Sequence, residues 1–293
     1  MDNKSMTALV SAFVRCYHYK NSNIKIYSDN YSDVILKKEE YDSILKNMSD
    51  GIKFFNPGFN GTKDDAIKWI VNNQLGPSVL GRSAFNKKSL ETAIEIGCQQ
   101  YLIYASGYDT SSIGRKIQCF EIDKHEIIQD KINRLQYHNI DTSNITFIKC
   151  DFRNNDWVNN ILNTSYNKSL ISFNSLLGIS YYLSKEKFND MINQISNIIC
   201  EGSSILFDYQ TNEFSKETSI NEKLASASNE EMKSKYSYDE IVKILSNNNM
   251  QIYEYLNADD ITNEYFYDYN IVNPNEKIIA PTGVAYILAV KHS

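Results

Sequence analysis

The sequence predicts an α/β protein with a doubly wound, seven-stranded, mostly parallel sheet, an antiparallel last strand and a helical N-terminal cap. Two features of the chain lead to this fold class. The first hundred residues place apolar side chains at helical spacing and show little strand pattern. From residue 100 onward, short apolar runs alternate with helical stretches, which is typical of parallel strands that are buried on both faces.

The N-terminal part is predicted to be helical because its apolar residues recur every three or four positions. This spacing is found in residues 8–16, 67–75 and 83–96. Asn56-Pro57-Gly58 and Gly76-Pro77 have the composition of turns and are expected to separate helices. We therefore expect residues 1–98 to form a cap or lid that precedes the sheet.

Seven apolar segments predict the strands of the sheet, at residues 100–105, 118–123, 144–150, 170–177, 204–209, 251–256 and 284–290. Helical patterns at 125–136 and 185–199 lie between them, so the connections should be right-handed crossovers. The last strand is expected to be reached by a hairpin-like return. The sheet part would span residues 99–293 and would form a single domain together with the cap.

The stretch at about 212–236 is polar and interrupts the alternation of strands and helices. We expect it to be helical and to act as a lid insertion over a site. Another helix is predicted directly after it, at 238–245. Ser237 is its expected N-cap, and Glu240 stands three residues later, as in a capping box.

Composition excludes several classes of protein. Thirty basic residues against thirty-six acidic ones give a net charge of −6, whereas a general nucleic-acid binder shows a basic stripe. The five cysteines are scattered without a CxxC pair, which favours reduced thiols and a cytoplasmic protein. The chain shows neither a secretory signal nor a long apolar run, so no membrane association is expected.

A glycine and two acidic residues lie at or directly after the ends of three successive predicted strands. This is the edge where ligands bind in open α/β sheets. Gly107 permits close backbone approach, although it also fits a plain tight turn. Asp123 can accept hydrogen bonds from ribose hydroxyls, or it can cap the following helix. Asp151 can accept from an adenine amino group while the aromatic ring of Phe152 packs on the base, and helix capping is again the alternative.

Two nucleotide fingerprints are missing. The chain has no G-x-G-x-x-G, and it has no G-x-x-x-x-G-K-[ST] loop that would cradle phosphates. A nucleoside without a pyrophosphate therefore fits best, and S-adenosylmethionine is the common cofactor of that kind. A nicotinamide-dependent dehydrogenase is the less favoured interpretation.

Several strings in the right order resemble the leucine carboxyl methyltransferase family. The family belongs to the class I S-adenosylmethionine-dependent methyltransferases, which have a Rossmann-like fold, and it includes relatives that methylate polyketide-type carboxylates. YASGYDT at 104–110, FEID at 120–123 and CDFRNNDW at 150–157 are close to its pattern GAGxDT, FEVD and DLRxDDW. LGRSAF at 80–85, SLLGISYYLS at 175–184 and ILFDY at 205–209 are similar to further segments of the family. The resemblance extends from about residue 6 to the end of the chain.

The resemblance implies a set of cofactor contacts. Arg82, and with it Arg15, would hold the carboxylate of the cofactor's methionine part, and Gly107 would let the backbone approach it. Asp123 would bind the ribose, and Asp151 with Phe152 the adenine.

Two positions depart from the family pattern. Ala105 replaces the first glycine and would still admit the cofactor. Leu177 stands where the family has an acid, and Asn174 or Ser175 is expected to replace that contact.

The expected reaction needs little from the protein beyond alignment. A carboxylate acceptor is already ionised at pH 7, so methyl transfer to it requires orientation and removal of water rather than a general base. The four histidines show no catalytic pairing, and no metal-ligand spacing occurs. Tyr181 and Tyr182 are the candidates for orienting the acceptor, and Tyr104 and Tyr108 are expected near the same pocket.

The sequence thus predicts an S-adenosylmethionine-dependent O-methyltransferase that acts on a carboxylate of a small molecule. The small-molecule substrate is the only partner expected. The alternative is a non-catalytic protein on the same fold that binds S-adenosylmethionine or a partner, and the departures at Ala105 and Leu177 motivate it.

Overall fold

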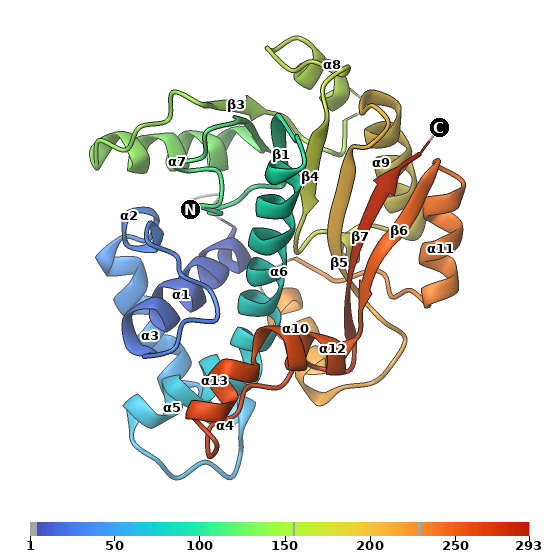
Figure 1. Cartoon of the computed structure of the whole chain (residues 1–293). Helices are drawn as coiled ribbons and strands as arrows, with labels where there is room; N and C mark the ends of the chain where they lie inside the picture. Colours follow the sequence, from blue (N-terminus) through green and yellow to red (C-terminus); the bar gives the residue numbers. More distant parts are fainter. Residues whose placement is uncertain (1–4, 155, 228–229, 293) are drawn as a thin grey trace.

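A computed structural model describes residues 5–154, 156–227 and 230–292. Its centre is a seven-stranded sheet in the order β3-β2-β1-β4-β5-β7-β6 (Figure 1). The strands are β1 (Gln100–Tyr104), β2 (Gln118–Asp123), β3 (Ile145–Lys149), β4 (Ser172–Leu176), β5 (Ser204–Gln210), β6 (Met250–Leu256) and β7 (Val284–Lys291). The pairs among β1 to β5 are parallel, and β7 runs antiparallel to both β5 and β6. The predicted doubly wound sheet with an antiparallel last strand is confirmed.

The central strands are buried throughout because both of their faces are covered. Every residue of β1, β4 and β5 is buried. Successive side chains point to opposite faces of a strand, so Tyr101 and Ile103 join one hydrophobic cluster while Leu102 and Tyr104 join the other. This explains why the strands appear in the sequence as continuous apolar runs rather than as alternating ones.

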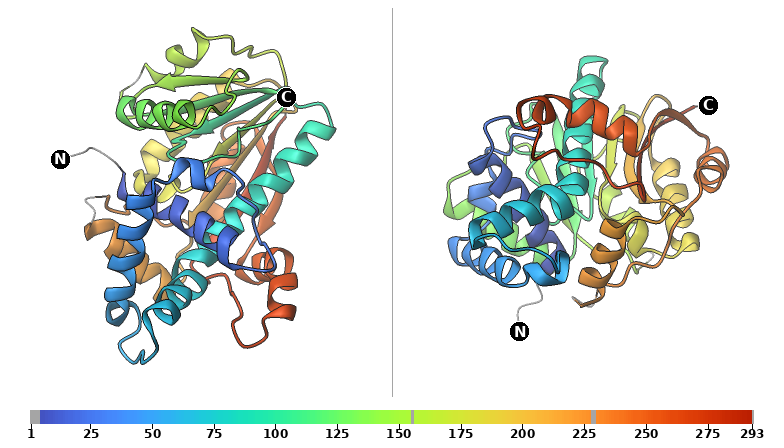
Figure 2. Two further views of the ribbon diagram at one scale, coloured as in Figure 1. Left: turned by 90° about the vertical axis from the view of Figure 1, so that its left-hand side faces the viewer. Right: turned by 90° about the horizontal axis from the view of Figure 1, so that it is seen from below.

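Helices lie on both sides of the sheet, as the turned views of Figure 2 show. One hydrophobic cluster joins the sheet to α6 (Gly76–Glu95), α7 (His125–Tyr137) and α12 (Ala258–Tyr265). The other cluster joins it to α8 (Trp157–Leu162), α9 (Lys185–Ile198) and α11 (Tyr238–Ser246). The strand order reverses between β1 and β4, so the edge where these two strands end is the place where this architecture binds ligands.

The N-terminal helices lie below the sheet in Figure 1, beyond the carboxyl ends of its parallel strands. They are α1 (Met6–Asn21), α2 (Ser32–Ile35), α3 (Lys38–Asp50), α4 (Ile52–Phe55) and α5 (Lys63–Ile70). Their apolar residues belong to the same hydrophobic cluster as Tyr101 and Phe173 of the sheet. The predicted helical cap is therefore present, and its apolar core is continuous with the core on one face of the sheet.

The turn expected at Gly76-Pro77 is wrong. A π-helical turn, η1 (Val71–Leu75), leads straight into α6 there, and Gly76 is helical with φ −60°. Pro77 is tolerated because the first residues of a helix need no N–H partner. A Cβ on Gly76 would lie 2.4 Å from the carbonyl oxygen of Val71, so the glycine allows the close packing of the two helical turns.

The hairpin-like return before the last strand is also wrong. Two helices, α12 and α13 (Tyr267–Val272), stand between β6 and β7. Asn257 begins α12 by accepting hydrogen bonds from the backbone N–H groups of Asp259 and Asp260, at 2.9 and 3.0 Å. β6 and β7 are still antiparallel neighbours, so the error concerns the connection and not the pairing.

The polar stretch after β5 contains one helix, α10 (Lys216–Ala227). The capping box predicted for α11 is confirmed, since the Ser237 hydroxyl accepts from the N–H of Glu240 and the Glu240 carboxylate accepts from the N–H of Ser237. Among the helices of the described residues, none is long and apolar enough to cross a membrane.

His18 fastens the end of α1 to the chain that follows it. Its Nε2 accepts from the backbone N–H of Ile26 at 3.0 Å, which leaves Nδ1 to donate to the hydroxyl of Ser22 at 3.0 Å. The imidazole is thus neutral, and burial, assisted by the charge of Lys25, lowers its pKa to about 4.

This pKa predicts an acid-sensitive contribution to stability. In the unfolded chain His18 is protonated below about pH 6.5, whereas in the folded protein it is protonated only below about pH 4. Its contribution to stability is therefore complete above pH 6.5 and is lost as the pH falls. We expect His18→Gln to make the loss of unfolding free energy between pH 7 and 5 smaller by about 2 kcal/mol. Urea unfolding at both pH values measures this, with the exposed His138→Gln as control. Equal pH dependence in both variants would contradict it.

Candidate functional site

The carboxyl ends of β1, β2 and β3 are joined by hydrogen bonds around Asp123. One carboxylate oxygen accepts from the N–H of Gly107 at 2.6 Å, and the other accepts from the N–H of Lys124 at 2.7 Å. The Asp123 carbonyl accepts from the N–H of Cys150 at 2.9 Å. Burial raises the pKa of Asp123, although both backbone donors act to lower it. The acid therefore lies fixed at the centre of three strand ends.

The loop after β1 passes twice through the left-handed region. Ala105 has φ 53° and Gly107 has φ 49°. A Cβ on Gly107 would lie 3.2 Å from the Cβ of Ala8 in α1, so both the conformation and the close approach of the cap favour glycine there. The hydroxyl of Ser106 between them is buried and has no hydrogen-bond partner among the residues that the structure describes. The loop thus leaves a polar group available at the edge of the sheet.

The ends of β4 and β5 are joined by a second carboxylate, Asp208. One of its oxygens accepts from the N–H of Gly178 at 2.6 Å, and the other accepts from Nη1 of Arg82 at 3.2 Å. The same Nη1 donates to the hydroxyl of Tyr181 at 2.9 Å, while Nη2 donates to Ser11 at 3.3 Å. Burial alone would lower the pKa of the Arg82 guanidinium, but Tyr181 and Asp208 beside it raise it above its ordinary value.

Tyr181 and Tyr182 lie next to each other on the short helix η2 (Ser180–Tyr182), with ring centroids 4.9 Å apart. Burial raises the pKa of both phenols, and that of Tyr182 reaches about 12. The chain after α10 crosses this segment, where the N–H of Lys233 donates to the carbonyl of Tyr181 at 2.6 Å. The segment after α10 therefore lies against Tyr181.

The same crossing segment also contacts the start of α1. The carboxylate of Glu230 accepts from the hydroxyl of Ser5 at 2.8 Å and from that of Thr7. Ser5 is the N-cap of this helix, because its hydroxyl accepts from the N–H of Ala8. The cap and the segment after α10 are thereby linked over the ends of β4 and β5.

Asp151 and Phe152 lie at the end of β3. Arg153 forms a two-pronged ion pair with the Asp151 carboxylate, with Nε 2.9 Å from each oxygen, and this pair holds the pKa of Asp151 down at about 2. The ring of Phe152 packs with those of Trp157 and Tyr104, at centroid distances of 5.5 and 6.3 Å. An aromatic surface thus follows β3, as the sequence suggested.

Arg15 is engaged elsewhere. Its Nε donates to the buried carboxylate of Asp29 at 2.8 Å, and its Nη2 donates to the carbonyl of Tyr108 at 2.6 Å. These bonds tie α1 to the loop after β1. Of the two arginines expected to hold a carboxylate, only Arg82 lies between the ends of β4 and β5.

Three further expectations are corrected by the side-chain contacts. Asn174 is a core residue, since its amide bonds to Ser172, to the carbonyl of Ser204 and to the hydroxyl of Tyr104. Tyr104 is consequently buried on the face of the sheet and does not line a pocket. The hydroxyl of Tyr108 donates to Asp130 of α7 at 2.6 Å.

Ser175 was the other expected replacement for the missing acid. Its hydroxyl is buried near the end of β4, and within the described part of the chain it has no hydrogen-bond partner.

Asp208 was missed by sequence reasoning. It lies inside the apolar string ILFDY, and an acid in such a buried strand was the available signal. Only 2% of Asp208 is exposed, so its charge depends on the guanidinium of Arg82.

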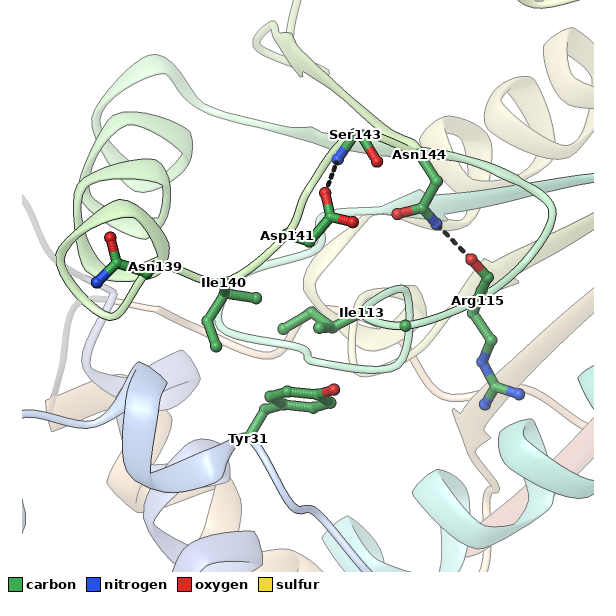
Figure 3. A pocket seen from close by; sticks show the side chains of 9 residues that line it. Tyr31, Ile113, Arg115, Asn139, Ile140, Asp141, Ser143 and Asn144 are labelled. Carbon is green, nitrogen blue, oxygen red and sulfur yellow. Dashed lines mark hydrogen bonds between the residues drawn. The ribbon is translucent and has the colours of Figure 1, made fainter.

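Figure 3 shows a cavity of about 310 Å³ away from these strand ends. It lies near the amino ends of β2 and β3, where the Asn144 amide donates to the carbonyl of Arg115 at 3.0 Å. Its lining includes Tyr31, Ile113 and Asp141, and none of the residues predicted to hold the cofactor. Within the described part of the chain, no group of three or more His, Cys, Asp or Glu residues is placed to hold a metal ion.

Comparison with known proteins identifies the family. The model of the leucine carboxyl methyltransferase family matches residues 8–196. The chain belongs to the leucine carboxyl methyltransferase family. A curated relative, the candidate S-adenosyl-L-methionine-dependent methyltransferase YktD of Bacillus subtilis (strain 168), is 32% identical over 99% of both chains. The prediction of an S-adenosylmethionine-dependent methyltransferase is confirmed at this level.

Solved structures support the fold. A DUF574 family protein of Streptomyces avermitilis MA-4680 has a TM-score of 0.63 at 12% identity, with 99% of each chain covered. A candidate methyltransferase of Thermobifida fusca YX has a TM-score of 0.61 at 13% identity, covering 99% of this chain and 96% of that one. At such identities the likeness concerns the architecture alone.

The left-handed conformation of Ala105 predicts a stabilising substitution. Ala105→Gly removes a conformational cost of about 1–2 kcal/mol. It also raises the entropy of the unfolded chain, which costs about 0.4–1 kcal/mol, so the net gain in stability is roughly 0–1.6 kcal/mol. We expect Tm to rise by roughly 1–3 °C in calorimetry. Ala93→Gly in α6, where the backbone is helical, serves as the control and should lower Tm. A fall in Tm for both variants would show that Ala105 is not strained.

Proposed function

We propose that the protein transfers the methyl group of S-adenosylmethionine to an oxygen atom of a small molecule, with a carboxylate as the acceptor. Family membership supports methyl transfer, and the residues at the strand ends support the cofactor assignment. The nature of the acceptor is inferred from the ionisable groups on the β4–β5 side of the site.

The residues at the strand ends fit the parts of the cofactor. A carboxylate has about four lone-pair sites, so Asp123 can accept two ribose hydroxyls besides its two backbone donors. Phe152 offers an aromatic face for the adenine, next to Asp151. Gly107 admits the backbone approach, and Ala105 precedes it in a matching left-handed conformation.

Arg82 is the proposed partner of the cofactor's amino-acid carboxylate. Its Nη1 donates to Asp208 and Tyr181, whereas the hydrogen bond that Nη2 makes among the described residues is a long one of 3.3 Å, to Ser11. A guanidinium with one edge held and the other edge accessible is suited to a carboxylate, which it can bind through parallel hydrogen bonds. Arg15 is not included, because Asp29 and the Tyr108 carbonyl already bind it.

When bound, S-adenosylmethionine supplies an electrophilic methyl group on a positively charged sulfur atom. The chain's own groups then have to align the acceptor and exclude water. The segment that carries Glu230 and Lys233 covers Tyr181 and joins the start of α1, so it is placed to close this side of the site. We propose that the cap, the sheet and this lid work as one domain, since one hydrophobic cluster joins the cap to the sheet.

The state of the phenols is the observation that carries the choice of a carboxylate acceptor. The pKa values of Tyr181 and Tyr182 are raised by burial, so neither phenol can take a proton from an acceptor at neutral pH. His18 is bound through both ring nitrogens at the far end of α1. An acceptor that arrives already ionised needs no such base, and Tyr181 and Tyr182 can then orient it by donating hydrogen bonds.

The ribose assignment makes Asp123 essential for cofactor affinity. Asp123→Ala removes two hydrogen bonds to a charged acceptor, so we expect S-adenosylhomocysteine to bind at least tenfold more weakly in calorimetry. The 2′-deoxy analogue of S-adenosylhomocysteine lacks one of the two hydroxyls, so wild type should bind it more weakly than the parent ligand. Asp123→Ala should therefore weaken the binding of this analogue less than it weakens the binding of S-adenosylhomocysteine. Exposed Glu126→Ala at the start of α7 is the control. Wild-type affinity in Asp123→Ala would refute the assignment.

The acceptor class can be tested by the chemistry of the product. A carboxyl methyl ester releases methanol in mild base, whereas a methyl ether does not. With methyl-labelled S-adenosylmethionine and panels of small carboxylic acids and phenols, we expect label to appear only in base-labile products. Base-stable products would refute the carboxylate. Cofactor binding without transfer to any acceptor in either panel would favour a non-catalytic protein.

A further inference from the structure

Asp208 is a buried acid on β5 whose two carboxylate oxygens are both committed. One fixes the backbone N–H of Gly178 and the other the guanidinium of Arg82, at 2.6 and 3.2 Å. Its carbonyl accepts from the hydroxyl of Ser180 at 2.6 Å. Asp208 is thus attached to α6 and to both sides of the turn that follows β4.

The pair of Asp208 and Arg82 is held together by burial. Their side chains are 3% and 14% exposed, and a buried charge without a counter-ion is costly. Each group therefore fixes the other. The turn adds a steric limit, because a Cβ on Gly178 would lie 2.9 Å from Nη1 and 3.0 Å from Nη2 of Arg82. The guanidinium plane lies against the Gly178 backbone and has little freedom to rotate.

The arrangement leaves Nη2 of Arg82 with one long hydrogen bond among the described residues, to Ser11 at 3.3 Å, and the side chain is 14% exposed. Asp208 and Tyr181 both take Nη1, so the fork of Arg82 is oriented before any ligand arrives. The pair is also net neutral, as is the amino-acid part of the cofactor with its carboxylate and ammonium groups. An ordered, neutral pair binds such a group at a smaller cost in side-chain entropy than a mobile arginine does.

We propose that Asp208 is a positioning residue for cofactor binding: it orients Arg82 and the Gly178 turn toward the amino-acid end of S-adenosylmethionine. The inference rests on the proposed function, because it assigns that end of the cofactor to Arg82. Asp208 itself acts through Arg82 and not by touching the nucleoside.

Two ligands separate this role from general stability. S-Adenosylhomocysteine carries the amino-acid end, and 5′-methylthioadenosine has the same nucleoside without it. We expect Asp208→Asn to lower the ratio of their affinities, measured by calorimetry, by about tenfold while the affinity for 5′-methylthioadenosine stays within about twofold of wild type. Equal weakening of both ligands would show that Asp208 is only structural and would overturn the inference.

A double-mutant cycle tests whether the effect passes through Arg82. In an Arg82→Lys background, the further change Asp208→Asn should leave the affinity ratio unchanged, and an additive loss would contradict the inference. Asp208→Glu keeps the charge but displaces the guanidinium of Arg82, so the affinity ratio should lie between those of wild type and Asp208→Asn. This variant replaces Asp208→Asn in the test if the latter does not fold. A wild-type ratio in the Glu variant would overturn the proposal.

The matched control is Glu121→Gln, which breaks another buried ion pair, with Lys131 on α7. It should lower Tm and leave the affinity ratio as in wild type. If wild type bound neither ligand, the proposed function itself would be refuted. The role of Asp208 is tested separately, by whether the affinity ratio of the two ligands differs between wild type and the variants.

Discussion

The buried guanidinium of Arg82 is the interaction on which the arrangement of the site depends. It comes from α6, yet its partners lie on other elements: Asp208 on β5, Tyr181 after β4 and Ser11 on α1. A buried guanidinium needs a counter-ion and hydrogen-bond acceptors. The four elements therefore pack in the arrangement that brings these partners to Arg82. The same constraint accounts for glycine at position 178, since a side chain there would collide with the guanidinium. Glycine also suits the left-handed conformation of this turn.

A second carboxylate organises the other half of the edge in a similar way. Asp123 holds the loop after β1 through the N–H of Gly107, and α1 approaches Gly107 so closely that a Cβ there would lie 3.2 Å from Ala8. The cap is therefore in contact with both halves, through Ala8 at Gly107 and through Ser11 at Arg82. The cofactor edge is formed jointly by the cap and the sheet, and displacement of α1 would disturb both carboxylates at once.

Much of this could be predicted from the sequence because it depends on local patterns. Apolar runs mark strands that are buried on both faces. Asp123 ends such a strand and Gly107 lies just after another, so the run itself shows where to look for them. Asp208 was not predictable in this way, because its role depends on an arginine 126 positions earlier. Gly76 and Pro77 misled for a related reason: their turn composition is equally compatible with the first turn of a helix, and only the close contact with Val71 distinguishes the two.

The two halves of the edge differ in a way that bears on the chemistry. The β1–β3 half contains carboxylates and an aromatic surface, which suit a nucleoside. The β4–β5 half contains a neutralised ion pair and the phenols of Tyr181 and Tyr182, whose raised pKa values make them hydrogen-bond donors and not bases. Such groups can align an anion, but they cannot create one. In the proposed function the acceptor's own acidity provides the nucleophile, which is why we propose a carboxylate rather than an alcohol or a phenol, whose oxygens are largely protonated at neutral pH.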